Sequence, residues 1–65
     1  HGPELSKREL DVLRGVLEGL TAVEIAETMG VQPSSVMTYQ KRAYKRLGIA
    51  GQRQLFALCL GPHAA

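Results

Sequence analysis

The chain has 65 residues, a formal net charge of +2 and a single cysteine, Cys59. This length allows one small domain, and 45% hydrophobic with 22% charged residues is typical of a folded chain, not of a disordered one. One cysteine excludes an internal disulfide and any zinc site built from several cysteines. No apolar run approaches the roughly 18 residues that a membrane span needs.

Charge is distributed unevenly along the chain. Residues 1–30 carry three basic and six acidic side chains, whereas residues 31–65 carry five basic and no acidic ones. Four of these five basic residues lie within positions 41–46. Such a cluster favours an anionic partner, most often nucleic acid, although a solvated helix face would show the same pattern.

The first predicted helix covers residues 7–18. It begins with a capping box, in which the side chains of Ser6 and Glu9 each accept a hydrogen bond from the other residue's backbone amide. Gly19 supplies a left-handed stop. Apolar residues recur at helical spacing and predict the core face of this helix: Leu10, Leu13, Leu17 and Leu20, with Val12 and Val16 alongside.

The second predicted helix covers residues 22–29 and uses the same signals. Thr21 and Glu24 form another capping box, and Gly30 is the stop. The third predicted helix therefore follows after only a short turn.

The third predicted helix covers residues 33–47 and ends at Gly48. Pro33 suits its first position, where a missing amide costs nothing, whereas Gln32 before it is a poor N-cap. A fourth helix is predicted over residues 52–60.

Gly51 can open the fourth helix, and Gly61 with Pro62 can close it. No stretch alternates as a strand would. The predicted fold class is therefore all-α, a compact four-helix domain over residues 5–61 with short tails at 1–4 and 62–65.

The junction between the second and third predicted helices has the spacing of a helix-turn-helix. Ala26 is small enough for two helices to cross closely, Gly30 can take the left-handed turn, and Val36 can anchor the next helix in the core. A generic helical hairpin could show this spacing, but the basic cluster beside it favours the helix-turn-helix.

The third predicted helix has two different faces when its side chains are projected at about 100° per residue. Val36, Ala43 and Leu47 share the core face, with Tyr39 and Gln40 at its edges. The separation of this core face from an outer face suits a helix that lies in the major groove. The first turns of such a helix meet base edges, and its later turns meet phosphates. The outer face and its edges consist of Ser34, Met37, Thr38, Lys41, Arg42 and Lys45.

Several separated motifs form one pattern over residues 5–60. They lie at residues 5–9, 19–21, 24–26, 35–39, 42–49 and 55–58. Together they resemble the DNA-binding domain of LuxR/GerE-type bacterial transcription regulators. The resemblance implies a domain at the C-terminus of a longer cytoplasmic regulator, behind an N-terminal sensor or receiver domain.

The resemblance also implies roles in binding double-stranded operator or promoter DNA. Base reading falls on Met37, Thr38 and Lys41, and the outer face of the helix adds Ser34. RNA polymerase is a further expected partner, and no cofactor, metal or membrane is expected. Contacts with the DNA backbone fall on Thr21, Ser35, Arg42, Tyr44, Lys45 and Arg46.

A weak homodimer through the fourth helix is expected from the same resemblance. We expect Leu55 and Leu58 to face the core, which leaves apolar surface at Phe56, Cys59 and Leu60 for a second copy. Cys59 is interpreted as a small apolar packing group, not as a redox sensor. The isolated domain should be monomeric or weakly dimeric and should pair on DNA.

The sequence departs from the family pattern at three places. Met37 stands where the family often has lysine, and its thioether could touch a thymine methyl group or simply pack. The role of Gln40 is open. Gly51 and Gln54 replace a typical serine and glutamate, so we expect the start of the fourth helix to fray.

Two other functions fit parts of the sequence. A promoter-binding region of a sigma factor has similar capping and a helix-turn-helix, but it tends to end near the position of Leu47, whereas this chain continues into a fourth helix. A helical protein-interaction module could carry an incidental basic face. An enzyme is not expected, because there is no nucleophile–base pair, metal-ligand cluster or glycine-rich phosphate loop.

Overall fold

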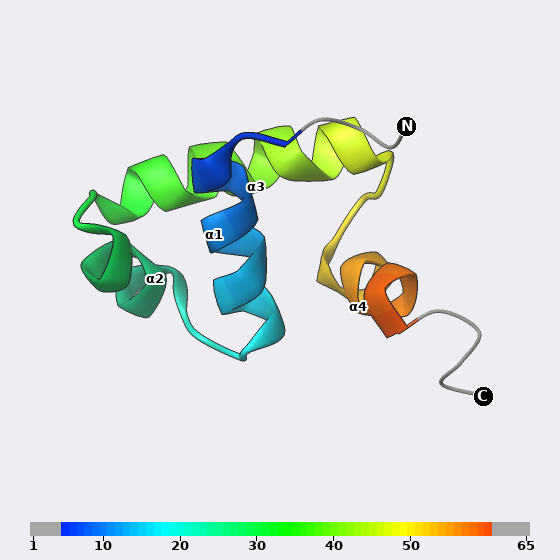
Figure 1. Cartoon of the computed structure of the whole chain (residues 1–65), viewed down its shortest axis with the longest axis horizontal. Helices are drawn as coiled ribbons and strands as arrows, with labels where there is room; N and C mark the ends of the chain where they lie inside the picture. Colours follow the sequence, from blue (N-terminus) through cyan, green and yellow to red (C-terminus); the bar gives the residue numbers. More distant parts are fainter. Residues whose placement is uncertain (1–4, 61–65) are drawn as a thin grey trace.

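The computed structural model describes residues 5–60, which form four helices (Figure 1). The predicted all-α fold is confirmed, and the described part of the chain contains no strand. The first helix ends one residue earlier than predicted, because Glu18 is its C-cap. The predicted tails, and the stop at Gly61 and Pro62, lie outside the described residues. The helices are α1 (Lys7–Leu17), α2 (Ala22–Met29), α3 (Pro33–Leu47) and α4 (Gln52–Leu60).

Both predicted capping boxes are present. The backbone amide of Ser6 donates to the Glu9 carboxylate at 2.9 Å, and the amide of Glu9 donates to Ser6 Oγ at 3.1 Å. Thr21 and Glu24 exchange the equivalent hydrogen bonds at 2.8 and 3.2 Å. These bonds satisfy amides that a helix leaves unpaired at its N-terminus, so α1 and α2 begin where their local sequences dictate.

The predicted glycine stops are also confirmed. Gly19, Gly30 and Gly48 have φ values of +83°, +71° and +71°, in the left-handed region that favours glycine. Gln32 makes no side-chain cap for α3, as predicted, and Pro33 stands at the start of that helix. Local signals therefore account for the bounds of the first three helices.

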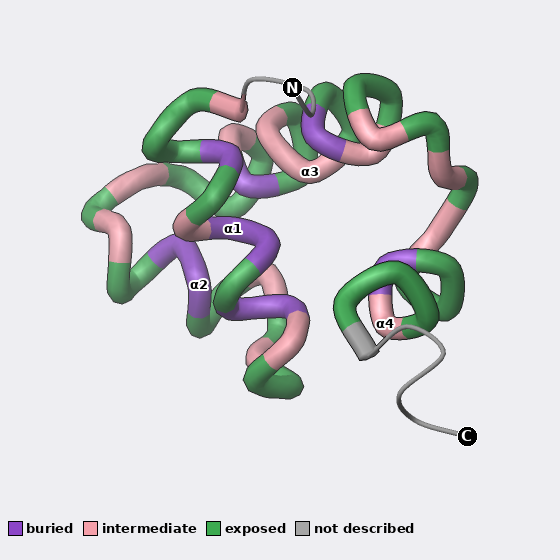
Figure 2. Tube along the Cα trace, turned by 45° about the vertical axis from the view of Figure 1, so that its right-hand side comes forward, coloured by how far each residue is buried: buried purple, intermediate pink, exposed green. Residues whose placement is uncertain are grey.

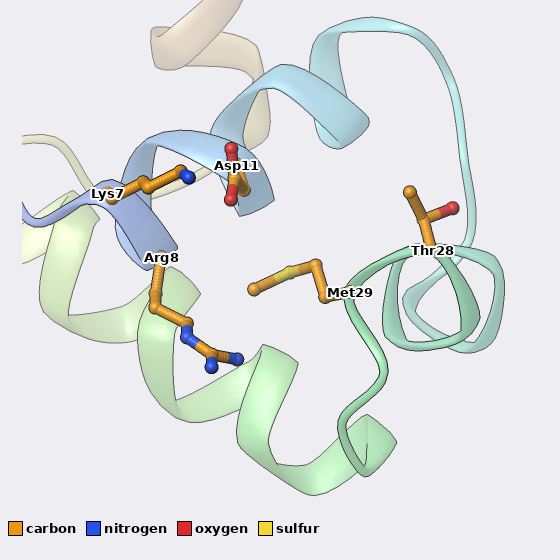
Figure 3. A pocket seen from close by; sticks show the side chains of 5 residues that line it. All are labelled: Lys7, Arg8, Asp11, Thr28 and Met29. Atoms are coloured by element: carbon orange, nitrogen blue, oxygen red, sulfur yellow. The ribbon is translucent and has the colours of Figure 1, made fainter.

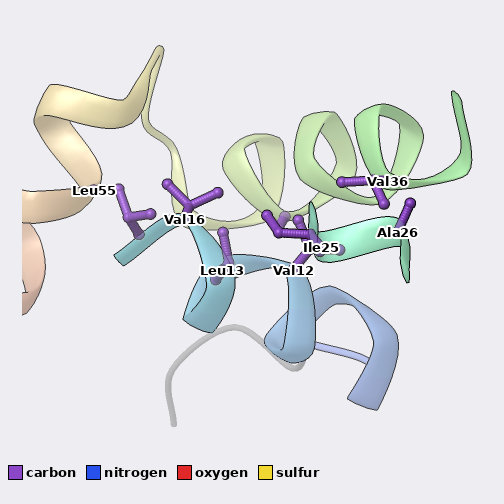
Figure 4. Packing of buried hydrophobic residues seen from close by; sticks show 8 residues of the cluster. Val12, Leu13, Val16, Ile25, Ala26, Val36 and Leu55 are labelled. Atoms are coloured by element: carbon purple, nitrogen blue, oxygen red, sulfur yellow. The ribbon is translucent and has the colours of Figure 1, made fainter. Parts of the chain in front are cut away.

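One hydrophobic core joins the helices (Figure 4). The helices α1, α2 and α3 pack against one another around it, and among the described side chains of α4 only Leu55 is buried. Figure 2 shows the buried segments of α1, α2 and α3 turned toward one another. The buried hydrophobic residues are Val12, Leu13, Val16, Ile25, Ala26, Val36, Ala43 and Leu55.

The predicted leucine stripe of α1 is wrong in part. Val12, Leu13 and Val16 are buried, whereas Leu10 is 49% exposed and Leu17 is only half-buried. α1 is apolar on more than one side. The side that faces two neighbouring helices becomes the core, and the leucines beside it are left at the surface.

α4 lies apart from the other three helices, at the end of the segment that follows α3 (Figure 1). Leu55 is buried as predicted, but Leu58 is 54% exposed, so the prediction that it faces the core is wrong. The helix meets the rest of the domain along one edge, and one turn beyond Leu55 its side chains already reach solvent. The predicted fraying is opposed by Gln54, whose side-chain carbonyl accepts a hydrogen bond from the Ala50 amide.

Gly15 allows a close approach between α1 and α2. A Cβ atom at this position would lie 2.6 Å from Cγ1 and 2.9 Å from Cδ1 of Ile25. Ile25 is itself buried in a packed core, so it has little room to move away. Helical periodicity gave no sign of this role, because it does not show which residue meets a neighbouring helix.

We expect Gly15→Ala to destabilise the domain by about 1–2 kcal/mol. Overpacking costs about 1–3 kcal/mol, and the better helix propensity of alanine returns no more than about 1 kcal/mol. Urea unfolding followed by circular dichroism measures the difference. The cost should shrink in the Ile25→Ala background, which lacks both the Cγ1 and the Cδ1 atoms. An equal cost in both backgrounds would show that this contact is not its cause.

Candidate nucleic-acid interface

α2, the turn after it and α3 form a helix-turn-helix, as the spacing predicts. Ala26 and Val36 are buried where the two helices meet (Figure 4). Gly30 has its left-handed φ at the turn, and the amide of Val31 donates to the Ala26 carbonyl at 3.0 Å. The amide of Val36 donates to the Gln32 carbonyl at 3.3 Å. Backbone hydrogen bonds and two buried side chains therefore fix the direction of α3.

α3 presents its polar face to solvent. Val36 and Ala43 are fully buried on the inner face, and Tyr39 and Gln40 are half-buried beside them, as predicted, whereas Leu47, expected on the core face, is only half-buried. The structure thus gathers the predicted base-reading residues on the outer face of the N-terminal half, with cations on the turns that follow. The exposed outer residues are Ser34, Met37, Thr38, Lys41, Arg42 and Lys45.

Two predicted backbone-contact residues already form hydrogen bonds inside the domain. Thr21, exposed at the start of α2, accepts a hydrogen bond from the Glu24 amide on its hydroxyl. The half-buried Tyr44 accepts one on its hydroxyl from Gln40 Nε2 at 2.9 Å. The side chain of Gln40 therefore orients a tyrosine. Ser35 is half-buried at the start of α3.

Arg46, in the last turn of α3, pairs with Glu9 of α1. Its Nε lies 3.6 Å from Glu9 Oε1, and 52% of the Arg46 side chain is exposed. Glu9 is only 2% exposed, and its carboxylate also accepts the hydrogen bond from Ser6. A buried carboxylate is tolerated when it is paired and hydrogen-bonded. Arg46 thus has a structural role, in addition to the phosphate contact predicted for it.

An apolar groove lies between α1, the end of α3 and α4. Cys59 lies at this groove with its thiol exposed, as expected of a residue that leaves apolar surface on α4. Phe56 is half-buried, and the side chain of Leu60 lies outside the described part. Helical periodicity assigned Leu10 and Leu58 to the core, so it did not predict that they would line this groove. The groove is lined by Leu5, Leu10, Leu13, Arg14, Leu17, Leu47, Leu55, Leu58 and Cys59.

A polar depression lies between the start of α1 and the end of α2 (Figure 3). Lys7, Arg8, Asp11, Thr28 and Met29 line it, and they include no nucleophile–base pair. Within residues 5–60, no group of histidine, cysteine, aspartate and glutamate side chains could hold a metal ion. None of the described helices has the length and apolar content needed to cross a membrane.

Comparison with known proteins identifies a family and several relatives. The model of the family "Bacterial regulatory proteins, luxR family" matches residues 3–59. The chain is 41% identical over 51 residues to a candidate HTH-type transcriptional regulator of Mycobacterium bovis and to one of Mycobacterium tuberculosis. It is 47% identical over 45 residues to the HTH-type transcriptional activator RamA of Corynebacterium glutamicum. No solved structure matches the chain.

These alignments cover most of the chain but little of the relatives. They include 78% of this chain and 6% of each mycobacterial protein, and 69% of this chain and 16% of RamA. The similarity therefore concerns one small domain of much longer proteins.

We expect Arg46→Ala to destabilise the domain by about 1–2 kcal/mol, because it leaves the buried Glu9 carboxylate without its cation. Solvent around the half-exposed guanidinium keeps the loss below that of a fully buried pair. The cost should fall in the Glu9→Gln background, where no buried charge remains. Thermal unfolding followed by circular dichroism measures this double-mutant cycle. Arg42→Ala, which removes an exposed cation from the same helix, is the control. The same Arg46→Ala cost in both backgrounds would disprove the coupling.

Proposed function

We propose that this chain, which belongs to the luxR family of bacterial regulatory proteins, reads double-stranded operator or promoter DNA with α3 in the major groove. Family membership and the named relatives make it a DNA-binding domain of transcription regulation. The proposal that α3 reads the major groove rests on one observation. The outer face of α3 is exposed, and along its length uncharged side chains are followed by cations. The helix-turn-helix fixes the direction of this helix.

Base reading is assigned to the first turns of α3. Ser34, Met37, Thr38 and Lys41 are spaced by three or four residues, so they lie on one side of the helix. The major groove admits an α-helix, and recognition helices contact base edges through their N-terminal residues. Their exposure, with Val36 buried on the opposite side, supports this orientation.

Affinity is assigned to contacts with phosphates. Arg42 and Lys45 are exposed on the turns beyond the proposed base-reading residues, where a helix in the groove meets the DNA backbone. Thr21, at the N-terminus of α2, is placed where the helix dipole favours an anion. Ser35, Tyr44 and Arg46 complete the proposed backbone contacts.

We further propose that two copies pair weakly through α4 on DNA, since one recognition helix reads few base pairs. Phe56, Cys59 and Leu60 are the proposed contacts, and Leu58 adds exposed apolar surface beside Cys59. The length of the relatives supports a sensor or receiver domain in the same protein. An activator among them supports RNA polymerase as a further partner.

Binding of labelled duplex DNA at increasing salt tests the proposed function. The logarithm of the affinity should fall steeply and linearly with the logarithm of the salt concentration, because contacts with phosphates release counterions. Lys45→Ala should weaken binding to all sequences about equally and reduce that slope by roughly one. A flat salt response would favour a protein-interaction module with an incidental basic face.

Lys41→Ala should behave differently from Lys45→Ala. It should cost roughly 1–3 kcal/mol on the preferred site and much less on random DNA, because a base contact exists only on the right base pair. Thr38→Ala should follow the same pattern with a smaller loss. All three side chains are exposed, so the variants should unfold at the wild-type temperature. Equal losses on both duplexes for Lys41→Ala would reassign Lys41 to phosphate.

Leu58→Asp tests the proposed pairing through α4. We expect it to prevent a second copy from joining a duplex with two half-sites, because a carboxylate would be buried in an apolar contact. Binding to a single half-site should be unchanged. Analytical ultracentrifugation of the protein–DNA complexes measures the stoichiometry. Ala57→Asp places the same charge on an exposed position of α4 that does not line the groove, and it should pair better than Leu58→Asp.

A further inference from the structure

Met37 is an exposed apolar side chain on the otherwise polar outer face of α3. The large exposed hydrophobic residues of the described chain are Leu10, Val23, Met37 and Leu58. Leu10 and Leu58 line the apolar groove, and Val23 belongs to α2. Met37 alone among them lies on α3, and it is 46% exposed. Nearly half of Met37 is therefore open to solvent, which favours a contact outside the domain over packing within it.

Thr38, which follows Met37 on this face, already uses its hydroxyl hydrogen within the helix. The hydroxyl of Thr38 donates its hydrogen to the Ser34 carbonyl at 3.1 Å. While it holds this bond, Thr38 can accept a hydrogen bond from a ligand and present its methyl group to it. Methionine has no donor either, and its sulfur is only a weak acceptor. Met37 and Thr38 therefore form a mainly apolar patch between Ser34 and Lys41.

The major groove contains one apolar group that such an apolar patch can recognise. Thymine presents its C5-methyl group there beside the O4 acceptor, whereas guanine, adenine and cytosine present only hydrogen-bond donors and acceptors. A thioether over one of those polar groups would leave it unpaired and would weaken binding. A thioether against the methyl group instead removes apolar surface from water on both sides.

We propose that Met37 is a specificity-determining residue that contacts the C5-methyl group of a thymine in the operator. The proposal rests on the proposed function, because it requires α3 to lie in the major groove. The recognised chemistry is a pyrimidine methylated at C5, which 5-methylcytosine shares. We assign it to thymine, the base that carries this methyl group without modification.

A uracil scan of the operator tests the proposal. The operator is first selected from random duplexes, and each thymine is then replaced by uracil, which removes only the methyl group. Uracil at one position of each half-site should weaken wild-type binding about fourfold, the effect of burying one methyl group. Met37→Ala and Met37→Gln should lose this penalty. Met37→Leu should keep it, because leucine is also apolar.

Further arms separate the methyl group from other causes. Val23→Ala removes an exposed apolar side chain outside α3, and it should retain the uracil penalty. At the same position, 5-methylcytosine should bind more tightly than cytosine in the wild type but not in Met37→Ala, and thymine should bind most tightly. Thermal unfolding shows that each variant is folded, which the exposure of Met37 leads us to expect.

Three results would overturn the assignment. These are an unchanged uracil penalty in Met37→Ala, the absence of any uracil-sensitive position in the wild type, and tighter binding of 5-methylcytosine than of thymine. The proposed function fails separately, through a flat salt response on every duplex. A steep salt response without sensitivity to uracil removes the role of Met37 alone.

Discussion

The buried carboxylate of Glu9 is the interaction on which the arrangement of the domain depends. It accepts the amide of Ser6 and so caps α1, and it pairs with Arg46 in the last turn of α3. A carboxylate that is 2% exposed would be costly without these partners. The same group therefore sets where α1 begins and where the end of α3 lies against it.

Small residues allow the remaining contacts between the helices. Gly15 brings α1 against Ile25, and Ala26 brings α2 against α3. Ala43, also buried, has the same small size on the inner face of α3. With its inner side packed in this way, α3 keeps its whole outer face in solvent. Residues on that face can therefore change without unfolding the domain.

α4 differs from the other helices in how it is held. Leu55 is its one buried anchor among the described residues, while Leu58 and Cys59 remain exposed at the apolar groove. A helix attached in this way adds little to the core. Its exposed apolar surface is better explained by a contact with another molecule, and this supports the proposed pairing of two copies.

The sequence by itself determined the number of helices and, to within one residue, the bounds of the first three, because these depend on contacts within one turn. Ser6 with Glu9, Thr21 with Glu24 and the glycine at 30 act on their immediate neighbours. The spacing of residues 33–47 likewise fixed which side of the third helix faces outward, since one strong apolar stripe leaves a single choice.

Only the tertiary structure decided which apolar side of α1 forms the core, and that Leu58 stays at the surface. Periodicity identifies apolar faces, but it does not show which of two faces a neighbouring helix covers. Periodicity also could not predict two contacts between helices, the approach of Gly15 to Ile25 and the pairing of Glu9 with Arg46. Each joins residues from different helices, and their distance depends on how the helices pack rather than on the spacing within either one.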